Sequence, residues 1–290
     1  MSFTKDGIDM NEREMVISQA LQTDEGRVAL AQAMVEPIRR SLEYQAVGRK
    51  LLMVDELPQG ALARYERDVA AKAYVVSRRG AVPDMYIAGE EVLVPTFEIA
   101  ANPTVRLSEI KARRFYIVDR AQIKAKEAIQ KTEDTNIFNA LIFAADNNGT
   151  QVIASVGSLS VASLNRAFRD IEQHDLVAAK IIMHANQYST IRALGKTFYD
   201  EATTREILST GLFGHLWTAD IHVSSRMDST TVLVVASAEN VGAFPIRQDI
   251  TVLPADDPKK LRLGWVIYEE VGIAIINDYA ISKITVVSAT

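Results

Sequence analysis

The sequence predicts an α+β protein in which helices and short strands are unevenly distributed along 290 residues. Three observations support this prediction. The first fifty residues are helix-like and rich in charge of both signs, and β-branched or aromatic runs separated by turns follow as far as residue 118. One long, mostly polar helical segment comes next. The remainder mixes helices with strands and becomes strand-rich toward its end.

Composition limits the class of protein before any element is placed. Hydrophobic residues make up 48% and charged residues 24% of the chain, as in folded globular proteins. The net charge of -5 argues against a dedicated nucleic-acid-binding surface, which needs clustered lysine and arginine. The absence of cysteine excludes disulfides, thiolate nucleophiles and cysteine-ligated zinc. Without an apolar leader or a run of about 20 apolar residues, we expect a soluble protein made in a reducing cytoplasm.

The N-terminal fifty residues predict two helices that form an arm. Asn11 and Glu14 have the spacing of a capping box at the start of the first helix. The second helix is expected from about Asp24 to Tyr44, and Pro37 should kink or restart it because proline lacks a backbone donor. The apolar stripe of both helices is thin, so this region suits an arm lying on another surface better than a core.

The segment from residue 51 to 118 predicts a projecting β-hairpin or small meander. Gly80, Pro83 and Gly89 are turn residues, and Pro95 within a strand indicates a sheet edge. Polar residues occur on both faces of most of the runs, which favours a projecting hairpin over a core sheet. The candidate strands are "KAYVV", "MYIAG", "EVLVPTFEI" and "RRFYIV".

A single helix is expected over Asp119–Asp146. Asp119 is the candidate N-cap with Gln122 at the third position, and a continuous helix of about 27 residues would span roughly 40 Å. Its apolar positions form a narrow stripe. The alternative is two helices with a turn near "KTEDTN", where Asp134 or Thr135 would cap the second.

The pattern after Asp146 predicts a mixed α/β block and a strand-rich tail. Apolar residues at helical spacing follow Ser158 or Ser160, either of which would cap that helix. The predicted short helices are "NQYSTIRAL" and "TTREILS". The predicted strands are "AAKIIM", which should be buried, "DIHVSS", "TTVLVVAS", "ITVLP", "LRLGWVIYEEVGIAII" and "ISKITVV", with "ADDPKK" as an exposed turn.

No motif in the chain predicts catalysis, a cofactor or a metal. "LGKT" at Leu194–Thr197 lacks the glycine that a phosphate-binding loop needs, because position 190 is threonine. "GSLS" at Gly157 lacks the second glycine of a nucleophile elbow. The four histidines have no zinc-site spacing and are expected to be ordinary surface or core residues: His174, His184, His215 and His222.

Two acidic pairs were further candidates for acid–base chemistry, Asp256–Asp257 and Glu269–Glu270. Neighbouring side chains in a strand point to opposite faces, so Glu269 and Glu270 should not converge. We therefore expect the first pair in a solvated loop and the second at a sheet edge. The chain is not predicted to be an enzyme.

Two consecutive stretches follow a recurring frame, "AAKIIMHANQYSTIRALGKTF" and "LSTGLFGHLWTADIHVSSRM". A strand ends, a short helix follows, and a glycine-bounded segment leads to a strand and Ser-x-Met. The residues of this frame are Met183, Gly211, Gly214, Ser225 and Met227, and "HAN" stands where Asn-Pro is usual. With the order arm, hairpin, long helix, α/β block and strand-rich tail, nearly the whole chain resembles the major capsid protein of tailed bacteriophages, which has the Hong Kong 97-like fold.

The resemblance implies five segments in one flat, L-shaped subunit. The hairpin around Tyr74–Ile99 would reach over a neighbouring subunit, and Asp119–Asp146 would be the spine helix along the long axis. The implied segments are an N-terminal arm (1–50), the extended loop and start of the peripheral domain (51–104), the peripheral domain with the spine helix (105–146), the axial domain (147–239) and a strand-rich return that completes both domains (240–290).

The resemblance also implies function and partners. Hexamers and pentamers would form an icosahedral shell in the virion around packaged double-stranded DNA, after synthesis in the host bacterial cytoplasm. Other copies would be the main partners, with portal, scaffold and decoration proteins; DNA would lie close without specific contacts, and no membrane or cofactor is involved. The expected inter-subunit contacts are Arg78, Arg79, Tyr86 and Phe97.

Three alternatives stay open. An encapsulin-type nanocompartment shell has the same fold but houses an enzyme in place of a genome. An α/β enzyme would assemble its site from scattered residues near His184, Asp200 and Glu201. A helical adaptor built on the long helix fits less well, because so much of the chain is predicted to be strand.

Overall fold

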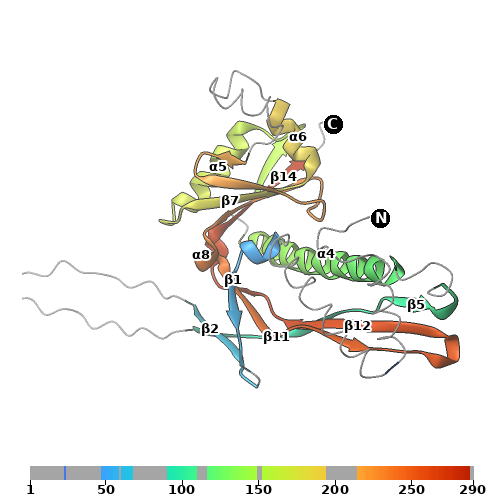
Figure 1. The fold of residues 1–290 in the computed structure, drawn as a ribbon. Coiled ribbons are helices and arrows are strands. Elements are labelled where there is room, and N and C mark those ends of the chain that lie inside the picture. The colour runs from blue at the N-terminus through green and yellow to red at the C-terminus, as the bar shows by residue number, and fades with distance from the viewer. Residues whose placement is uncertain are drawn as a thin grey trace, which may run out of the picture.

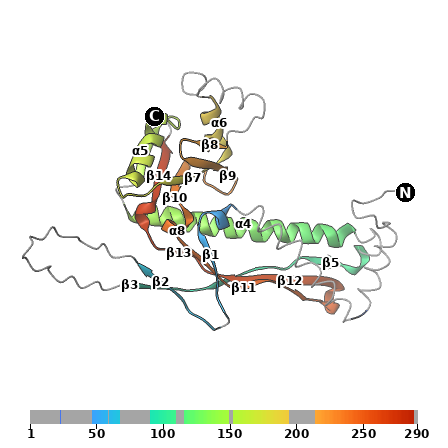
Figure 2. The same ribbon diagram turned by 60° about the vertical axis from the view of Figure 1, so that its left-hand side comes forward.

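Two six-stranded sheets and one long helix make up the body of the protein (Figure 1). The computed structural model describes residues 23, 47–58, 60–67, 90–109, 116–148, 152–193 and 214–287. Helix α4 (Tyr116–Asn147) runs along the first sheet, and the second sheet stands over one end of this helix (Figures 1 and 2). The body is therefore L-shaped, and the predicted α+β class is confirmed.

The first sheet is built around one long hairpin, β11 (Gly242–Pro254) and β12 (Arg262–Val271), whose loop contains the short helix η3 (Pro258–Lys260). Strand β1 (Met53–Glu56) pairs parallel to β11, and β13 (Ala274–Ile275) pairs antiparallel to it. Strands β4 (Phe97–Ala101) and β5 (Thr104–Arg106) pair antiparallel to β12. Alternate residues of β12, from Trp265 to Val271, are buried on one face, as the two-residue period of a strand requires.

The second sheet has the strand order β6-β14-β10-β7-β9-β8. Its central strand β10 (Thr231–Ala236) is buried along its whole length, which its unbroken run of apolar residues allows. The other strands are β6 (Val152–Val156), β14 (Ile281–Val287), β7 (Ala178–Met183), β9 (Ala219–Val223) and β8 (His215–Leu216).

Within the described part of the chain, short helices border the second sheet. Helix α5 (Val161–Glu172) packs on its strands through Leu164, Phe168 and Ile171. The predicted cap Ser160 is confirmed, because its hydroxyl accepts a hydrogen bond from the Ser163 backbone N–H at 3.1 Å. The others are α6 (Ala185–Ala193), α8 (Ala238–Val241) and η4 (Asp278–Ala280).

Helix α4 is continuous, so the two-helix alternative is excluded. The helix already includes Tyr116–Val118, which the sequence assigned to a strand, and Asp119 therefore lies inside it and is not its N-cap. Asp134 and Thr135 lie in mid-helix, so neither is the N-cap of a second helix in this segment. The Thr135 hydroxyl instead donates to the Lys131 carbonyl, one turn earlier in the helix. No helix within the described ranges is both long and apolar enough to cross a membrane.

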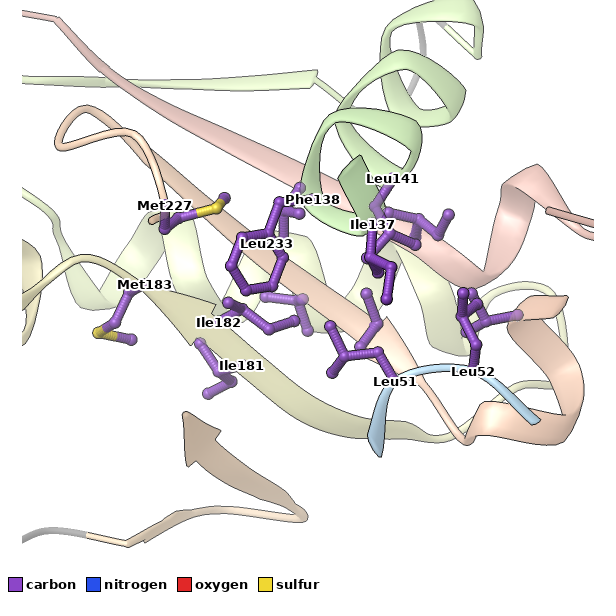
Figure 3. Packing of buried hydrophobic residues seen from close by; sticks show 14 of the residues in the cluster. Leu51, Leu52, Ile137, Phe138, Leu141, Ile181, Ile182, Met183, Met227 and Leu233 are labelled. Atoms are coloured by element: carbon purple, nitrogen blue, oxygen red, sulfur yellow. The ribbon is translucent and has the colours of Figure 1, made fainter. Parts of the chain in front are cut away.

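A short segment, which we call the strap (residues 47–52), crosses α4 and joins the main core. It contains the helix η1 (Gly48–Lys50) followed by Leu51 and Leu52, both fully buried. Figure 3 shows these leucines gathered with Phe138 of α4 and Leu233 of β10. One continuous apolar cluster therefore runs from the first sheet through α4 and the strap to the second sheet.

The strand predicted over "EVLVPTFEI" is two strands in different sheets. Strand β3 (Glu90–Val94) pairs antiparallel to β2 (Ala63–Arg67) in a separate two-stranded sheet, whereas β4 joins β12. Pro95 lies between them, where its missing N–H interrupts no ladder. Most of the hairpin expected around Tyr74–Ile99 lies outside the described residues, and Phe97–Ile99 at its end belong to the first sheet, where β4 pairs with β12.

The packing of the strap on α4 can be tested at Gly48. A Cβ at this position would meet Ile137 Cδ1 at 2.6 Å and Asp134 Oδ1 at 2.9 Å. We expect Gly48→Ala to lower the free energy of unfolding by about 1–3 kcal/mol, because a packed interface must shift. Chemical denaturation of the unassembled chain measures this change. Gly214→Ala is the control, because no atom of the described residues lies within 4 Å of a Cβ there; equal losses in both variants would contradict the packing.

Candidate functional site

Two adjacent glutamates in β12 each bind an arginine, on opposite faces of the first sheet. Glu269 is fully buried, and the Glu270 side chain is 22% exposed. The prediction that they diverge is confirmed. The prediction that they lie at a sheet edge is wrong, because β12 lies between β11 and β4. Both carboxyl groups accept hydrogen bonds from arginine.

The buried face carries an ionic cluster formed by Arg49, Glu133 and Glu269. Arg49 of the strap donates to Glu133 of α4 through Nε at 2.8 Å and Nη2 at 3.1 Å. The same Nη2 donates to Glu269 Oε2 at 3.0 Å. The guanidinium also lies 5.7 Å from the centre of the Phe244 ring, within range of a cation–π contact. One side chain therefore joins strap, helix and sheet.

A second carboxyl group of α4 holds the strap backbone next to this cluster. Asp134 Oδ1 accepts a hydrogen bond from the Gly48 N–H at 2.9 Å. Burial raises the pKa of Asp134, while the backbone donors Gly48 and Val47 oppose that rise. Glu133 and Asp134 are neighbours in the helix, and both point to the strap. Because both carboxyl groups bind the strap, the polar stretch "KTEDTN" is accommodated inside a continuous helix.

The ionic cluster has more carboxyl groups than cations. Burial, and then the negative charge of Glu133, raise the pKa of Glu269 to about 8. Burial also raises the pKa of Glu133, against the opposing effect of Arg49. Burial works to lower the pKa of Arg49, but its carboxylate partners outweigh this and the pKa is raised. With a pKa of about 8, Glu269 keeps its proton at neutral pH, beside the salt bridge between Arg49 and Glu133.

The opposite face of β12 holds the base of the β2–β3 pair. Glu270 Oε1 accepts hydrogen bonds from Arg247 Nη1 at 2.7 Å and from the Thr96 hydroxyl. Arg247 Nη2 donates in turn to the Ala61 carbonyl at 3.2 Å. Ala61 precedes β2 and Thr96 follows β3. Glu269 thus attaches the strap to one face of β12. Its neighbour Glu270 attaches the start of β2 and the end of β3 to the other face.

Side-chain contacts also attach the β2–β3 pair to the first sheet. The Tyr65 hydroxyl donates to Asp55 Oδ2 of β1 at 2.9 Å. Burial, followed by this hydrogen bond and then by the Asp55 charge, raises the pKa of Tyr65. A small apolar cluster lies beneath it, formed by Ala63, Val94, Ala243 and Ala274. Leu62 and Leu93 are more than half exposed at this place. The base of the β2–β3 pair is therefore packed against the first sheet on one side and exposes apolar side chains to solvent on the other.

The structure places only part of the predicted contact and enzyme residues. Phe97 begins β4, where it is 38% exposed and in register with Val271. Arg78, Arg79 and Tyr86 lie outside the described residues, as do Asp200 and Glu201 of the enzyme alternative.

His184, the centre of the enzyme alternative, has a structural role at the start of α6. Its carbonyl accepts from the Gln187 and Tyr188 N–H groups, and its Nδ1 accepts from the Asn186 N–H at 3.2 Å. These bonds satisfy donors that the first turn of a helix leaves unpaired. Across the described ranges, no group of three or more histidine, aspartate or glutamate residues is placed to hold a metal ion.

Arg49 supports a direct test of the ionic cluster. We expect Arg49→Met to lower the free energy of unfolding by about 3–5 kcal/mol, because it leaves buried carboxyl groups without their cation. Arg64→Met is the control, since its ion pair with Glu91 is 55% exposed on both sides and should cost under about 1 kcal/mol. Urea denaturation measures both variants. A loss no larger for Arg49 than for Arg64 would show that the cluster contributes nothing specific.

Glu269 predicts a stability that depends on pH. Its pKa is about 8 in the folded chain and 4.5 as a model value, so the folded state binds the extra proton between these two pH values. Its contribution is complete below about pH 4.5 and is lost as the pH rises through about 8, by at most about 1.4 kcal/mol per pH unit. We expect Glu269→Gln, which cannot ionise, to flatten this fall when unfolding is measured from pH 5 to 9.

The control for this titration is Glu127→Gln. Lys124 lowers the pKa of the exposed Glu127 through a hydrogen bond, so the effect of that carboxylate is confined to acid solution. The slope between pH 5 and 9 should then match that of the unaltered chain. A Glu269→Gln variant that kept the full slope would rule out Glu269 as its source.

No family model and no curated protein matches the chain, whereas many solved structures do. A structure of Microbacterium phage Oxtober96 matches with a TM-score of 0.64 at 14% identity, over 83% of this chain and 91% of that chain. The capsid structure of Cyanophage P-SCSP1u matches with a TM-score of 0.62 at 12% identity, over 84% and 89%. The crystal structure of a virus-like particle from Pyrococcus furiosus matches with a TM-score of 0.57 at 16% identity, over 88% and 99%.

Each of these matches covers more than four fifths of the chain. At identities of 12–16%, these matches are evidence for the fold alone. The chain therefore has the fold of tailed-phage major capsid proteins, and the Hong Kong 97-like fold that the sequence predicts is confirmed.

Proposed function

We propose that the chain is the major capsid protein of a tailed bacteriophage, a structural subunit whose hexamers and pentamers form an icosahedral shell around double-stranded DNA. The observation that carries this proposal is the match to a phage capsid over 84% of this chain and 89% of the other. Its site of action is then the virion, after synthesis in the host cytoplasm. Portal, scaffold and decoration proteins are its further partners.

The two-sided attachment at β12 supports a role in assembly. A shell is held by many copies of individually modest contacts, so each contacting segment must begin from a fixed point. Arg49 fixes the chain at the end of the proposed N-terminal arm. Glu270 and Arg247 fix the base of the proposed extended loop. Arg78, Arg79, Tyr86 and Phe97 are the contacts proposed for that loop and its base.

The segments implied by the sequence map onto this proposal. The first sheet and α4 correspond to the peripheral domain with its spine helix. The second sheet corresponds to the axial domain, which would meet its copies around fivefold and sixfold centres. Strand β14 belongs to the second sheet and β11 and β12 to the first, so residues 240–290 contribute to both. The role is structural, and no catalytic step is assigned.

A compartment that encloses protein cargo is the second candidate. It is favoured by the match to the virus-like particle from Pyrococcus furiosus, which covers 99% of that chain. The genes beside the coding sequence separate the two candidates. Terminase and portal genes support the virion, and a gene for a cargo enzyme supports the nanocompartment.

Assembly of the purified chain tests the shell proposal. We expect closed shells, tubes, sheets or rings of five or six subunits in negative-stain electron microscopy, and matching large species in sedimentation velocity. Phe97→Asp should weaken assembly if the base of the loop contacts a neighbour, because it places a charge on an apolar surface. Glu98→Asp is its control at the next exposed position of β4. A monodisperse dimer or tetramer at high concentration and high salt would contradict the proposal.

A further inference from the structure

Three consecutive residues of the strap bind three different parts of the body. Gly48 binds α4, and Arg49 binds both α4 and β12 of the first sheet. The carbonyl of the next residue, Lys50, accepts a hydrogen bond from the Lys180 side chain of β7, in the second sheet. In both views the blue helix of the strap lies beside α4, beneath the second sheet (Figures 1 and 2). The strap therefore crosses the joint between the second sheet and the rest of the body.

The strap can leave the body without breaking the interior of a sheet. Strand β1, which follows the strap, is an edge strand that pairs with β11. Its first residues, Met53 and Val54, are 49% and 44% exposed. The strap itself holds one turn of 3-10 helix, so it is retained by the burial of Leu51 and Leu52 and by the polar contacts of residues 48–50. A peripheral segment of this kind opens at a lower free energy than the whole protein.

Acidic groups outnumber cations where the strap covers Glu269. The charged groups that face Glu269 come from three elements packed against it: Arg49 of the strap, Glu133 of α4 and Asp249 of β11. On β4, the residue in register with Glu269 is the apolar Ile99. Glu269 Oε2 accepts from Arg49, whereas the buried Oε1 accepts no hydrogen bond from the described residues. This second oxygen is therefore the place for a proton.

Contact with Glu133 supports this position of the proton. The hydrogen bond between the two carboxyl groups acts to raise the pKa of Glu269 and to lower that of Glu133, as expected when Glu269 donates to Glu133. Burial is the larger cause of the raised pKa of Glu269. If the strap leaves, water reaches Glu269 and this cause is removed. The open state therefore binds the proton less tightly than the closed state.

We propose that the strap is a latch across the joint between the two sheets, and that Glu269 controls the latch by holding or releasing its proton. The closed latch keeps the proton on Glu269. Opening transfers this proton to water, so a rise in pH favours the open latch. The open latch detaches the strap, which joins residues 1–46 to the body, and removes the bond from Lys180 to Lys50. This device belongs to the single chain and goes beyond the proposed shell function.

A buried cysteine measures the opening, because the chain has no cysteine of its own. Leu52 is 2% exposed, so the thiol of Leu52→Cys reacts with a thiol reagent when the strap opens. Dividing its rate by that of the same chain unfolded in urea at the same pH removes the titration of the thiol. The closed state loses its proton near pH 8 and an exposed glutamate near pH 4.5. We expect this rate ratio to rise by up to about tenfold per pH unit from pH 5 to 8, and to level off above pH 8.

Three further variants assign the effect to the latch. Glu269→Gln in the Leu52→Cys chain cannot ionise and should abolish the rise with pH. Lys180→Met in the same chain removes the donor to the strap and should raise the rate ratio about tenfold at every pH. Val234→Cys places the thiol in the fully buried centre of β10, where it reports opening of the whole body. It should react at least about tenfold more slowly than Leu52→Cys.

Each part of the proposal can fail separately. Equal rate ratios for Leu52→Cys and Val234→Cys would overturn the latch, because the strap would then open only with the whole body. A rise with pH that persists in Glu269→Gln would overturn the control by its proton. An unchanged rate ratio in Lys180→Met would overturn the tie to the second sheet.

Hydrogen exchange gives the same test without a cysteine, should Leu52→Cys fail to fold. The amides of residues 47–52 in the unassembled chain are compared with those of Glu269→Gln at the same pH, which removes the pH dependence of exchange itself. We expect the unaltered strap to exchange increasingly faster than the Glu269→Gln strap as the pH approaches 8. Equal exchange at every pH would overturn the latch, and none of these results depends on whether the chain forms shells.

Discussion

The buried ion pair between Arg49 and Glu133 fixes where the chain enters the body, and the other contacts of the strap depend on it. Glu133 lies on the apolar stripe of α4, and Glu269 lies on the apolar face of β12. The Glu133 carboxylate could not be buried there without a cation, because the cost of desolvating an unpaired charge is several kcal/mol. Glu269 keeps its proton at neutral pH, and its buried carboxyl group accepts a hydrogen bond from Arg49 Nη2. Arg49 meets both, so the strap can occupy one place only. Leu51 and Leu52 then enter the core directly behind it.

If only apolar contacts joined the strap, α4 and the first sheet, the relative positions of these elements would be less precisely fixed. Apolar contacts have no direction, and a helix can slide on a sheet at small cost when only burial is at stake. Hydrogen bonds at 2.8, 3.1 and 3.0 Å from one guanidinium to two elements allow no such shift. On the other face, the bonds from Arg247 to Glu270 and to Ala61 do the same for the β2–β3 pair. Strand β12 is therefore the common reference for both attached segments.

Most elements could be predicted from the sequence, but the ionic cluster was missed. Helix α5, strand β7 and helix α6 follow from local patterns with nearly their observed bounds, and Ser160 is one of the two caps that the sequence offers for α5. The sequence alone does not decide whether α4 is continuous, because "KTEDTN" has the composition of a turn. In the structure its two acidic residues, Glu133 and Asp134, accept hydrogen bonds from the strap. A signal was present: Glu133 follows Ile129 and precedes Ile137 at helical spacing, on one buried stripe. Arg49 lies 84 residues from Glu133 and 220 residues from Glu269 in the sequence. No rule based on local sequence therefore connects the three residues.

The second sheet is joined to α4 and the first sheet by a different kind of interaction from the one that holds the strap. Lys283 of β14 binds Asp146 of α4 at 2.7 Å, but Asp146 is 48% exposed, and an ion pair at such a place contributes under about 1 kcal/mol. The joint therefore depends on the continuous apolar core that connects α4 with both sheets. Titration of Glu269 acts on the strap, where burial makes charge costly, and leaves that core unchanged. A shell subunit built in this way keeps its shape through its core, while the ionic clusters set how firmly its attached segments are held.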